Sequence, residues 1–301
     1  MIIDESKFKK ILNQQGWKKS DLCTVGISSR TIAKIAKGED LRESVIERIA
    51  NSLGISSDEI IQENAILLTL DRERKLKVPG GLYHETQIRL TYNSNHIEGS
   101  RLTEDQTRYI FETKRVGALS PDLPLDDVLE TNNHFKCIDE IIIHAREPLT
   151  EALILRLHSL LKAGTEFATQ YGAGRYKQFP NTVGGIETTA PSMVSAAMRD
   201  LIAGYNRIKA PTFEDIVAFH YSFECIHPFQ DGNGRIGRLI LFKECLKNDL
   251  IPTYIDDRYK AEYYNGLRQW RTERGYLIET CRLGQDLYKR LLDYFEIPYQ
   301  S

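Results

Sequence analysis

The chain has 301 residues, 41% of them apolar, which suggests two domains with enough apolar side chains for a sizeable core. Forty Lys and Arg residues against 42 Asp and Glu residues give a net charge of −2, which excludes binding to nucleic acid or membranes by bulk charge alone. No apolar run approaches roughly 18 residues, the N-terminus lacks a signal-peptide core, and the five cysteines form no CxxC pair, so we expect a cytoplasmic protein with reduced thiols and no membrane span.

Residues 1–64 are predicted to form a small helical domain. Apolar residues recur there at helical spacing in three stretches, and a glycine stands where each helix would end, as Gly16 and Gly54 do. The positive charges of this domain gather toward its first half. That arrangement leaves room for a local basic surface on a chain of near-neutral net charge.

Residues 65–301 are predicted to form a second, nearly all-helical domain. A helix over about 65–78 ends at a Val-Pro-Gly-Gly sequence, where Pro and Gly break it. Further helices are predicted at about 82–96, 103–115, 126–146, 150–163, 193–207, 212–226, 233–248, 258–272 and 277–295. The segment from Gly172 to Pro191 is rich in Gly and β-branched residues and predicts a loop with a short hairpin. The fold class is therefore mostly all-α, a helical core with a short β-hairpin plus a small N-terminal helical bundle.

Residues 227–238 read His-Pro-Phe-Gln-Asp-Gly-Asn-Gly-Arg-Ile-Gly-Arg and carry the chemistry of the chain. The Gly-Asn-Gly turn opens a predicted helix, whose first N–H groups lack intrahelical partners and attract phosphate. Asp231 can hold a Mg²⁺ ion that bridges phosphates. Arg235 and Arg238 share one helix face, from which both can reach anionic oxygens.

His227 stands just before this turn and completes the set. An imidazole has a reference pKa of about 6.5, which suits a general base. Each feature alone has an ordinary structural explanation: a histidine beside a proline, a simple turn, two solvated arginines. Together within twelve residues, a base, a metal carboxylate, an anion-binding turn and two arginines predict phosphoryl or nucleotidyl transfer.

This segment resembles the Fic family motif HxFx(D/E)GNGRxxR, which it matches at every specified position, and the resemblance covers roughly residues 84–272. Fic proteins are mostly adenylyltransferases that move AMP from ATP to a Ser, Thr or Tyr hydroxyl of a target protein. The resemblance implies that His227 deprotonates that hydroxyl and that Asp231 binds Mg²⁺. The implied nucleotide-binding residues are Gly232, Asn233, Gly234, Arg235 and Arg238. The first three would form an anion hole, and Arg238 would pair with the γ-phosphate.

Two further segments resemble parts of the same family. Residues 174–191 resemble the flap hairpin, whose edge pairs with the target backbone by strand addition. The implied target-binding residues are Val183, Gly184, Gly185 and Ile186. Tyr263 and Tyr264 align with a Tyr-Tyr pair near the adenine pocket, although ordinary helix packing explains that pair equally well.

Residues 94–99, Ser-Asn-His-Ile-Glu-Gly, resemble the family's inhibitory motif (S/T)xxxE(G/N). Ser94 and Glu98 are four apart and therefore lie on one face of the helix predicted at about 82–99. The resemblance implies that Glu98 pairs with Arg238 in place of the γ-phosphate and inhibits the enzyme from within the same chain. The alternative is a plain helix C-terminus with Gly99 as its stop.

Residues 17–55 resemble a Cro/λ-repressor-type helix-turn-helix, with its turn at Val25-Gly26-Ile27. The recognition helix would start near Ser28 and present its first residues to the major groove. The candidate DNA-binding residues are Ser28, Ser29, Arg30 and Lys34. The alternative is a helical module that binds protein instead of DNA.

Together these patterns predict an autoinhibited protein adenylyltransferase that uses ATP and Mg²⁺, acts on a hydroxyl-bearing target protein, binds DNA through residues 17–55 and forms a homodimer. Two alternatives stay open: a DNA-binding regulator whose Fic domain only senses nucleotide, and a transferase that uses another nucleotide donor. The intact His227 favours an enzyme, because sensing a nucleotide needs no base.

Overall fold

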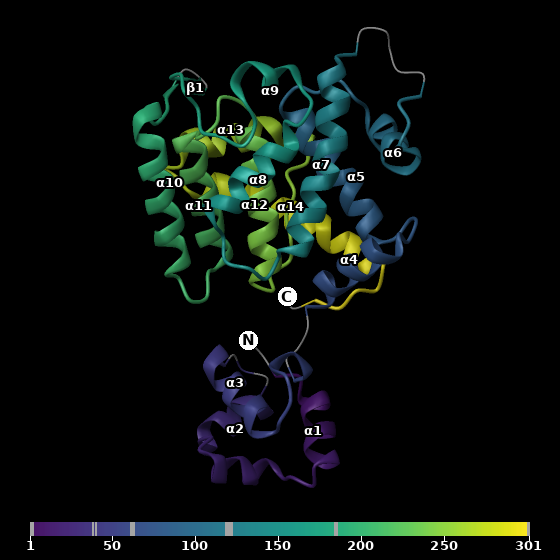
Figure 1. Ribbon diagram of the computed structural model, residues 1–301, viewed down its shortest axis with the longest axis vertical. Coiled ribbons are helices and arrows are strands. Elements are labelled where there is room, and N and C mark those ends of the chain that lie inside the picture. Colours follow the sequence, from purple (N-terminus) through teal and green to yellow (C-terminus); the bar gives the residue numbers. More distant parts are fainter. Residues whose placement is uncertain are drawn as a thin grey trace. The chain divides into compact units, whose positions relative to one another are not determined.

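The chain forms two compact units, residues 1–64 and 65–301, and each is described by itself (Figure 1). This computed structural model describes residues 3–37, 39, 41–60, 64–117, 123–183 and 186–299. Each unit has its own apolar core, built from side chains of its own helices.

The first unit is a bundle of short helices. Its elements are α1 (Glu5–Gln14), the 3₁₀ helix η1 (Lys19–Val25), α2 (Ser29–Ala36), α3 (Glu43–Ser52) and the 3₁₀ helix η2 (Ser57–Glu59). Asp4 caps α1 by accepting from the main-chain N–H groups of Ser6 and Lys7, and Ser28 caps α2 by accepting from that of Thr31. The buried core consists of Ile3, Phe8, Leu12, Leu22, Ile27, Ile35, Leu41, Ile46, Ile49, Ala50, Leu53 and Ile60.

A 3₁₀ helix, η1, precedes the turn that the sequence places at Gly26. This glycine adopts a φ of 82°, a left-handed conformation that a residue without Cβ reaches at little cost. α2 then begins at Ser29, directly after its cap. The tight turn and the capped helix start are both explained by local residue chemistry.

The second unit is helical with one short hairpin (Figure 1). Its elements are α4 (Ala65–Leu76), α5 (Leu82–Ile97), α6 (Glu104–Thr113), α7 (Leu125–Ile143), α8 (Glu151–Leu161), α9 (Glu166–Tyr171), β1 (Thr182–Val183), β2 (Ile186–Glu187), α10 (Pro191–Asn206), α11 (Phe213–Ile226), α12 (Asn233–Lys247), the 3₁₀ helix η3 (Asp257–Tyr259), α13 (Lys260–Gln269) and α14 (Gly275–Tyr294). This confirms the predicted fold class. Within the described ranges, no helix combines the length and the apolar character needed to cross a bilayer.

The helices predicted in this unit are present, and their ends differ from the predicted ones by at most three residues. α9 is the element that the sequence pattern does not predict. It has six residues and no buried side chain, so it shows no apolar periodicity. Its start is fixed by Thr165, whose hydroxyl accepts from the Ala168 N–H, and its end by Gly172, with a φ of 76°.

α12 is the buried centre of the second unit, and α5, α7, α8 and α11 all pack against it (Figure 1). The approach of α11 depends on Gly237, where an added Cβ would lie 2.3 Å from Glu224 and 3.0 Å from His220. Because α12 is enclosed on all sides, its N-terminus has a fixed position. The loop at 227–232 that leads into it is therefore a suitable place for a site.

Candidate active site

His227 lies at the entrance to this loop as the C-cap of α11. It adopts a φ of 50° and a ψ of 61°, a left-handed conformation that is uncommon outside glycine, and its N–H bonds to the Phe223 carbonyl at 2.9 Å. Burial lowers the pKa of the imidazole to about 4, while the nearby main-chain carbonyl of Glu224 acts in the opposite direction. The ring is therefore neutral near pH 7 and able to accept a proton.

Asn233, the first residue of α12, closes the loop from within. Its Oδ1 accepts from the Phe229 N–H at 2.7 Å, and its Nδ2 donates to the Phe229 carbonyl at 2.8 Å. Gly232 turns the chain into the helix with a φ of 84°. The Asn233 side chain is thus engaged by the loop itself. The part of Asn233 that remains available to the predicted anion hole is its main-chain N–H at the helix N-terminus.

His158, on α8, fixes the loop from the other side. The Gly174 N–H donates to His158 Nδ1 at 2.9 Å, so the proton is assigned to Nε2, which donates to the Asp231 carbonyl at 3.1 Å. Its ring stacks on that of Phe229 with centroids 3.9 Å apart, and burial lowers its pKa to about 4. His158 therefore has a structural role that joins the motif loop to the segment preceding the hairpin.

Arg238 is held by the C-terminal end of α5. Its Nη2 donates to Glu98 Oε1 at 2.7 Å and to the Ser94 carbonyl at 2.8 Å, while its Nε donates to Ser94 Oγ at 3.0 Å. The Arg238 side chain is 2% exposed. Burial acts to raise the pKa of the Glu98 carboxyl, but Arg238 and Arg235 outweigh it and hold that pKa below its usual range. Glu98 is accordingly ionised and directly paired.

Glu98 also lies against the Gly-Asn-Gly turn, the predicted anion-binding turn. An added Cβ on Gly234 would lie 2.2 Å from Glu98 Oε1 and 2.9 Å from Arg238 Nη1. The carboxylate thus occupies the place beside the helix N-terminus where an anion is favoured. Glu98 is at the same time the C-cap of α5, followed by Gly99 with a φ of 98°. The helix stop and the contact with Arg238, which the sequence presents as alternatives, coexist in one residue.

Arg235 belongs to a second charged group, which also contains Asp231, Glu130 on α7 and Lys162 at the end of α8. Lys162 Nζ donates to both carboxylates, Arg235 donates to Glu130, and Arg235 Nη2 lies 3.4 Å from Asp231 Oδ2. The side chains of Lys162 and Arg235 are 1% and 6% exposed. Although burial acts to raise it, the pKa of Asp231 is lowered to about 2 by Arg235 and Lys162. Asp231 is therefore a carboxylate at any pH near neutrality.

Sequence reasoning did not point to Glu130, Lys162 or Glu224. Lys162 follows His158 by four residues, so both side chains lie on the same face of α8. This spacing was a sequence signal that Lys162 faces the motif loop. Glu224 precedes His227 by three residues, and its Oε2 lies 3.9 Å from His227 Nδ1. Burial raises the pKa of Glu224 to about 8. Glu130 has no local signal, because only the packing of α7 on α12 brings it to Arg235.

The two tyrosines predicted near an adenine pocket lie in different surroundings. Tyr263 is 1% exposed, its hydroxyl bonds to His220 Nε2 at 2.8 Å, and the Arg238 guanidinium lies 5.8 Å from its ring. Its surroundings are those of a residue packed beside Arg238, and a place near the adenine stays a prediction. Tyr264 is half-buried, and its hydroxyl lies 3.5 Å from the Ile97 carbonyl, close to the end of α5.

The predicted flap is tied at its base to the motif loop. The Lys177 N–H donates to the Pro228 carbonyl at 2.9 Å, and Asn181 Nδ2 donates to the Phe229 carbonyl at 3.0 Å. Lys177 Nζ in turn donates to Asn181 Oδ1 at 2.7 Å, and burial lowers the pKa of this lysine to about 8. The base of the hairpin is therefore hydrogen-bonded to the residues that follow His227.

Of the four predicted flap residues, two are described. Val183 is 36% exposed and pairs with Ile186 in the antiparallel register of β1 and β2. Gly184 and Gly185 lie outside the described residues.

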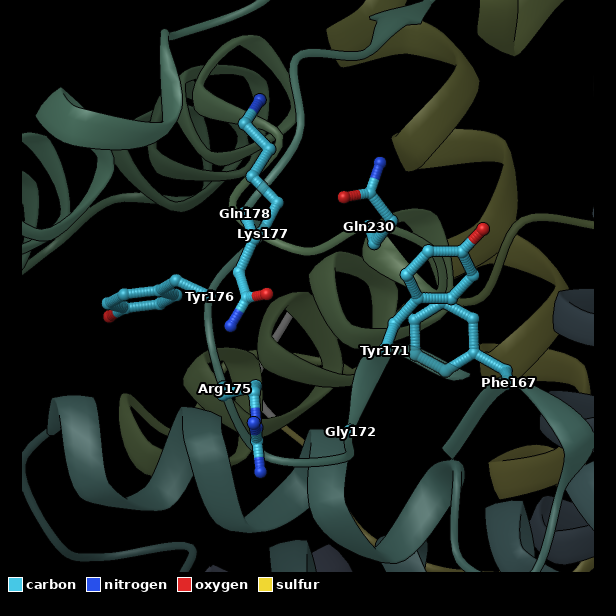
Figure 2. Close-up of a pocket in the computed structure, with 8 residues that line it drawn as sticks. All are labelled: Phe167, Tyr171, Gly172, Arg175, Tyr176, Lys177, Gln178 and Gln230. Atoms are coloured by element: carbon cyan, nitrogen blue, oxygen red, sulfur yellow. The ribbon is translucent and has the colours of Figure 1, made fainter. Parts of the chain in front are cut away.

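A small cavity adjoins the loop on the hairpin side (Figure 2). It is lined by Phe167, Tyr171, Gly172, Arg175, Tyr176, Lys177, Gln178 and Gln230. Its volume of about 10 Å³ has room for one water and excludes a nucleotide. A larger cavity of about 550 Å³ in the same unit is lined by none of the predicted site residues.

Three of the four candidate DNA-binding residues, Ser28, Ser29 and Arg30, stand at the start of α2 in the first unit, and Lys34 lies in its last turn. Ser28, Ser29 and Arg30 are exposed. Lys34 Nζ lies 3.6 Å from Glu39 Oε2, within ion-pair distance. Ser28 Oγ accepts from the Thr31 N–H at 3.1 Å, so this hydroxyl serves as the helix cap. The exposed side chains of Ser29 and Arg30 are the ones that this helix start offers to a partner.

The sequence of this chain is similar to those of known proteins. Residues 148–244 match the Fic/DOC family. The chain is 28% identical over 208 residues to a protein adenylyltransferase Fic of Nematostella vectensis, covering 66% of this chain and 48% of that protein. It is 25% identical over 190 residues to the protein adenylyltransferase fic-1 of Caenorhabditis elegans, covering 62% and 37%. The chain thus spans about half or less of the length of these curated relatives.

Solved structures show the same arrangement of helices. A Fic domain containing signaling protein from Bacteroides thetaiotaomicron superimposes with a TM-score of 0.61 at 24% identity, covering 76% of this chain and 94% of that one. Fic-1 from C. elegans gives a TM-score of 0.60 at 20% identity, covering 91% and 80%. The fold is therefore that of Fic-domain structures, and the segment that contains the loop and most of α12 matches the Fic/DOC family.

Proposed function

We propose that this chain is an autoinhibited protein adenylyltransferase that transfers AMP from ATP to a Ser, Thr or Tyr hydroxyl of a target protein. The observation that carries this proposal is the meeting, at one loop, of a neutral histidine, an ionised carboxylate and the N-terminus of α12. The names of the similar proteins support ATP as the donor and a protein as the acceptor.

In the proposed reaction, His227 accepts the proton of the target hydroxyl as its oxygen bonds to the α-phosphorus of ATP. The bond from that phosphorus to the bridging oxygen of the β-phosphate breaks, and pyrophosphate leaves. Main-chain N–H groups at the start of α12 and the guanidinium of Arg235 stabilise the charge on the phosphates. A neutral ring near pH 7 is the protonation state that a base requires.

Asp231 fits the role of a Mg²⁺ ligand. Its side chain is 52% exposed, and its pKa of about 2 keeps it ionised. Mg²⁺ prefers oxygen ligands and is commonly held by one or two carboxylates together with substrate phosphates. A bound ion would neutralise charge on the phosphates, while the loop contacts of His158 and Asn233 hold Asp231 in place.

Glu98 supports the inhibited state of the proposal. Its carboxylate pairs with Arg238 and lies against Gly234, so a γ-phosphate that needs the same guanidinium must displace it. Like charges in one place repel, and the nucleotide is then held in an unproductive way or excluded. The substitution Glu98→Gly removes the carboxylate and is expected to release the activity.

The donor chemistry is tested with ATP labelled either on the α- or on the γ-phosphate. The Glu98→Gly variant is incubated with a bacterial lysate, and Glu98→Gly/His227→Ala is the matched control. Label from the α-position alone, lost in the control, supports AMP transfer. Label from the γ-position indicates phosphoryl transfer instead. No label with either nucleotide, when ATP binding is confirmed separately, favours the nucleotide-sensing regulator or another donor.

We further propose that the first unit binds duplex DNA through the start of α2. The Gly26 turn and the Ser28 cap leave Ser29 and Arg30 exposed at a helix N-terminus, the part of such a helix that enters a major groove. A gel shift of the full chain with DNA from upstream of its own gene tests this, with Arg30→Ala as the variant. Absence of salt-sensitive binding to any duplex would contradict it and favour a protein-binding module.

A further inference from the structure

Four charged side chains from separate elements meet beside the anion-binding turn, and their formal charges cancel. Asp231 and Glu130 contribute two negative charges, and Lys162 and Arg235 contribute two positive charges. Each cation contacts both carboxylates. The carboxylate proposed to bind Mg²⁺ is therefore already neutralised by side chains of this chain.

Lys162 is fixed in this position by its surroundings. Its side chain is 1% exposed, its Nζ lies 4.7 Å from the centroid of the Phe167 ring, and its Cε would lie 3.2 Å from a Cβ added to Gly232. Its main-chain N–H bonds to the His158 carbonyl at 3.1 Å, at the end of α8. A lysine enclosed in this way cannot turn its ammonium group to solvent when another cation approaches.

Both cations contact the same oxygen of Asp231, Oδ2. Oδ1 receives neither contact, and half of the Asp231 side chain is exposed. A divalent cation that approaches Asp231 meets two carboxylates whose charge is already balanced by two fixed positive charges. The group as a whole therefore offers it no net electrostatic attraction.

We propose that Lys162 is a positioning residue that acts as the permanent counter-cation of Asp231, so that the nucleotide-free site does not bind divalent cations and Mg²⁺ enters together with the phosphates of ATP. This inference rests on the proposed function, because it concerns the same carboxylate and the same nucleotide. The negative phosphates reverse the local charge balance, and Asp231 Oδ1 then adds one oxygen to the ligands that the phosphates supply.

Loss of the lysine would change the charge balance of this group. In Lys162→Met, two carboxylates share the single positive charge of Arg235, and the site gains one net negative charge. Two neighbouring carboxylates with a net negative charge are a typical site for a divalent cation. The variant is therefore expected to bind metal without nucleotide, whereas Lys162→Arg keeps the charge and the wild-type behaviour.

The experiment measures Mn²⁺ binding to the full chain by electron paramagnetic resonance, with no nucleotide present. Lys162→Met is expected to bind Mn²⁺ at least tenfold more tightly than wild type. Adding Glu130→Gln to it restores a neutral balance and is expected to return the affinity to the wild-type level, although the lysine is still absent. Arg156→Met is the matched control, because Arg156 also joins α8 to α7, through Glu140, at an exposed position.

Two results would overturn the proposal. One is tight nucleotide-free binding of Mn²⁺ by the wild type, a measurement that does not depend on any variant being folded. The other is an unchanged affinity in Lys162→Met when circular dichroism shows a native helical content. Neither readout uses AMP transfer, so a failure of the proposed reaction leaves the metal result interpretable.

Discussion

Arg235 and Arg238 lie one turn apart on α12, yet the regions that hold them differ in kind. Arg238 is bound by the end of α5, through one carboxylate and one residue with two acceptor oxygens. Arg235 is enclosed in a group of four charges contributed by α7, α8, the motif loop and α12 itself. One arginine has a partner at a helix terminus, and the other has partners that also bind one another.

Because of this difference, a ligand can replace the partner of Arg238, whereas the partners of Arg235 are fixed. Glu98 can leave Arg238 without breaking another ion pair, provided that an anion such as a γ-phosphate replaces it. Removing any member of the Arg235 group leaves the others unbalanced in a buried place, which is costly. The proposed regulation therefore concerns the Arg238 region, whereas the Arg235 region supplies fixed electrostatics.

The largest effect on the rate of AMP transfer is expected from substitution of His227, the proposed base of the reaction that both regions support. His227→Ala in the Glu98→Gly background should lower the rate of AMP transfer by about 10²–10⁴-fold, because the proton of the target hydroxyl then has no acceptor. The rate is measured with α-labelled ATP under saturating nucleotide. A variant that retains more than a tenth of the activity would show that His227 is not the base.

Substitution of each arginine should lower the free energy of unfolding by a different amount in the two regions. Arg235→Met leaves two carboxylates with Lys162 alone and should lower the free energy of unfolding by about 3–5 kcal/mol. Arg238→Met should cost less, about 1–3 kcal/mol, because the Glu98 side chain is 27% exposed and can turn to water. Urea denaturation measures both. Equal losses, or a larger loss for Arg238→Met, would contradict the distinction.

Acid should weaken both regions through their neutral histidines. Burial lowers the pKa of His158, beside Asp231, to about 4 and that of His220, beneath Arg238, to about 3. The unfolded chain therefore binds more protons than the folded one once the pH falls below about 6.5, and stability is lost from there down toward pH 4. Each histidine contributes about 1.4 kcal/mol per pH unit in that interval.

Denaturation curves at pH 7 and pH 5 test this dependence. The free energy of unfolding should be clearly lower at pH 5 than at pH 7. His158→Asn is the informative variant, because it removes one of the buried neutral histidines and should reduce the difference between pH 7 and pH 5. A difference that does not shrink would show that His158 is not buried in its neutral form.

A smaller effect is expected for nucleotide binding in the Arg238 region. Glu98→Gly removes the carboxylate that competes with the γ-phosphate, so ATP should bind about tenfold more tightly, which adds about 1.4 kcal/mol of stabilisation at saturation. Thermal melting with and without ATP gives this difference. Equal stabilisation of wild type and variant would show that Glu98 does not compete with nucleotide.

The smallest effect is expected for Ser94→Ala. The substitution removes the hydroxyl that accepts from Arg238 Nε, but the Ser94 carbonyl and Glu98 still hold the guanidinium. The expected loss of stability is about 1 kcal/mol, with at most a small rise in labelling. A release as large as that of Glu98→Gly would mean that the hydroxyl, and not the carboxylate, maintains inhibition.

Local sequence signals predict one of these regions far better than the other. Ser94 and Glu98 are four apart on one helix, and Arg235 and Arg238 are three apart on another, so their faces follow from helical periodicity. Helix starts such as Ser28, and stops such as Gly99, follow from capping chemistry in the same way.

Glu130 could not be predicted, because tertiary packing alone brings it to Asp231. Lys162 has only its four-residue spacing from His158 as a local signal. The two residues precede Asp231 by 101 and 69 residues, and one charged residue on a helix resembles any other in the sequence. α9 escaped prediction for a similar reason, since an exposed six-residue helix has no apolar pattern. The burial of Tyr263 could not be distinguished from a place in a ligand pocket, because an aromatic side chain suits both.

Inhibition by Glu98 is tested most directly by the initial rate of AMP incorporation from α-labelled ATP, measured for wild type and Glu98→Gly side by side on the same lysate. We predict at least a tenfold higher rate for Glu98→Gly, because the anion-binding turn and Arg238 become free to hold the phosphates in the reactive arrangement. Equal rates in two folded proteins would contradict the claim that Glu98 restrains an adenylyltransferase from within the chain.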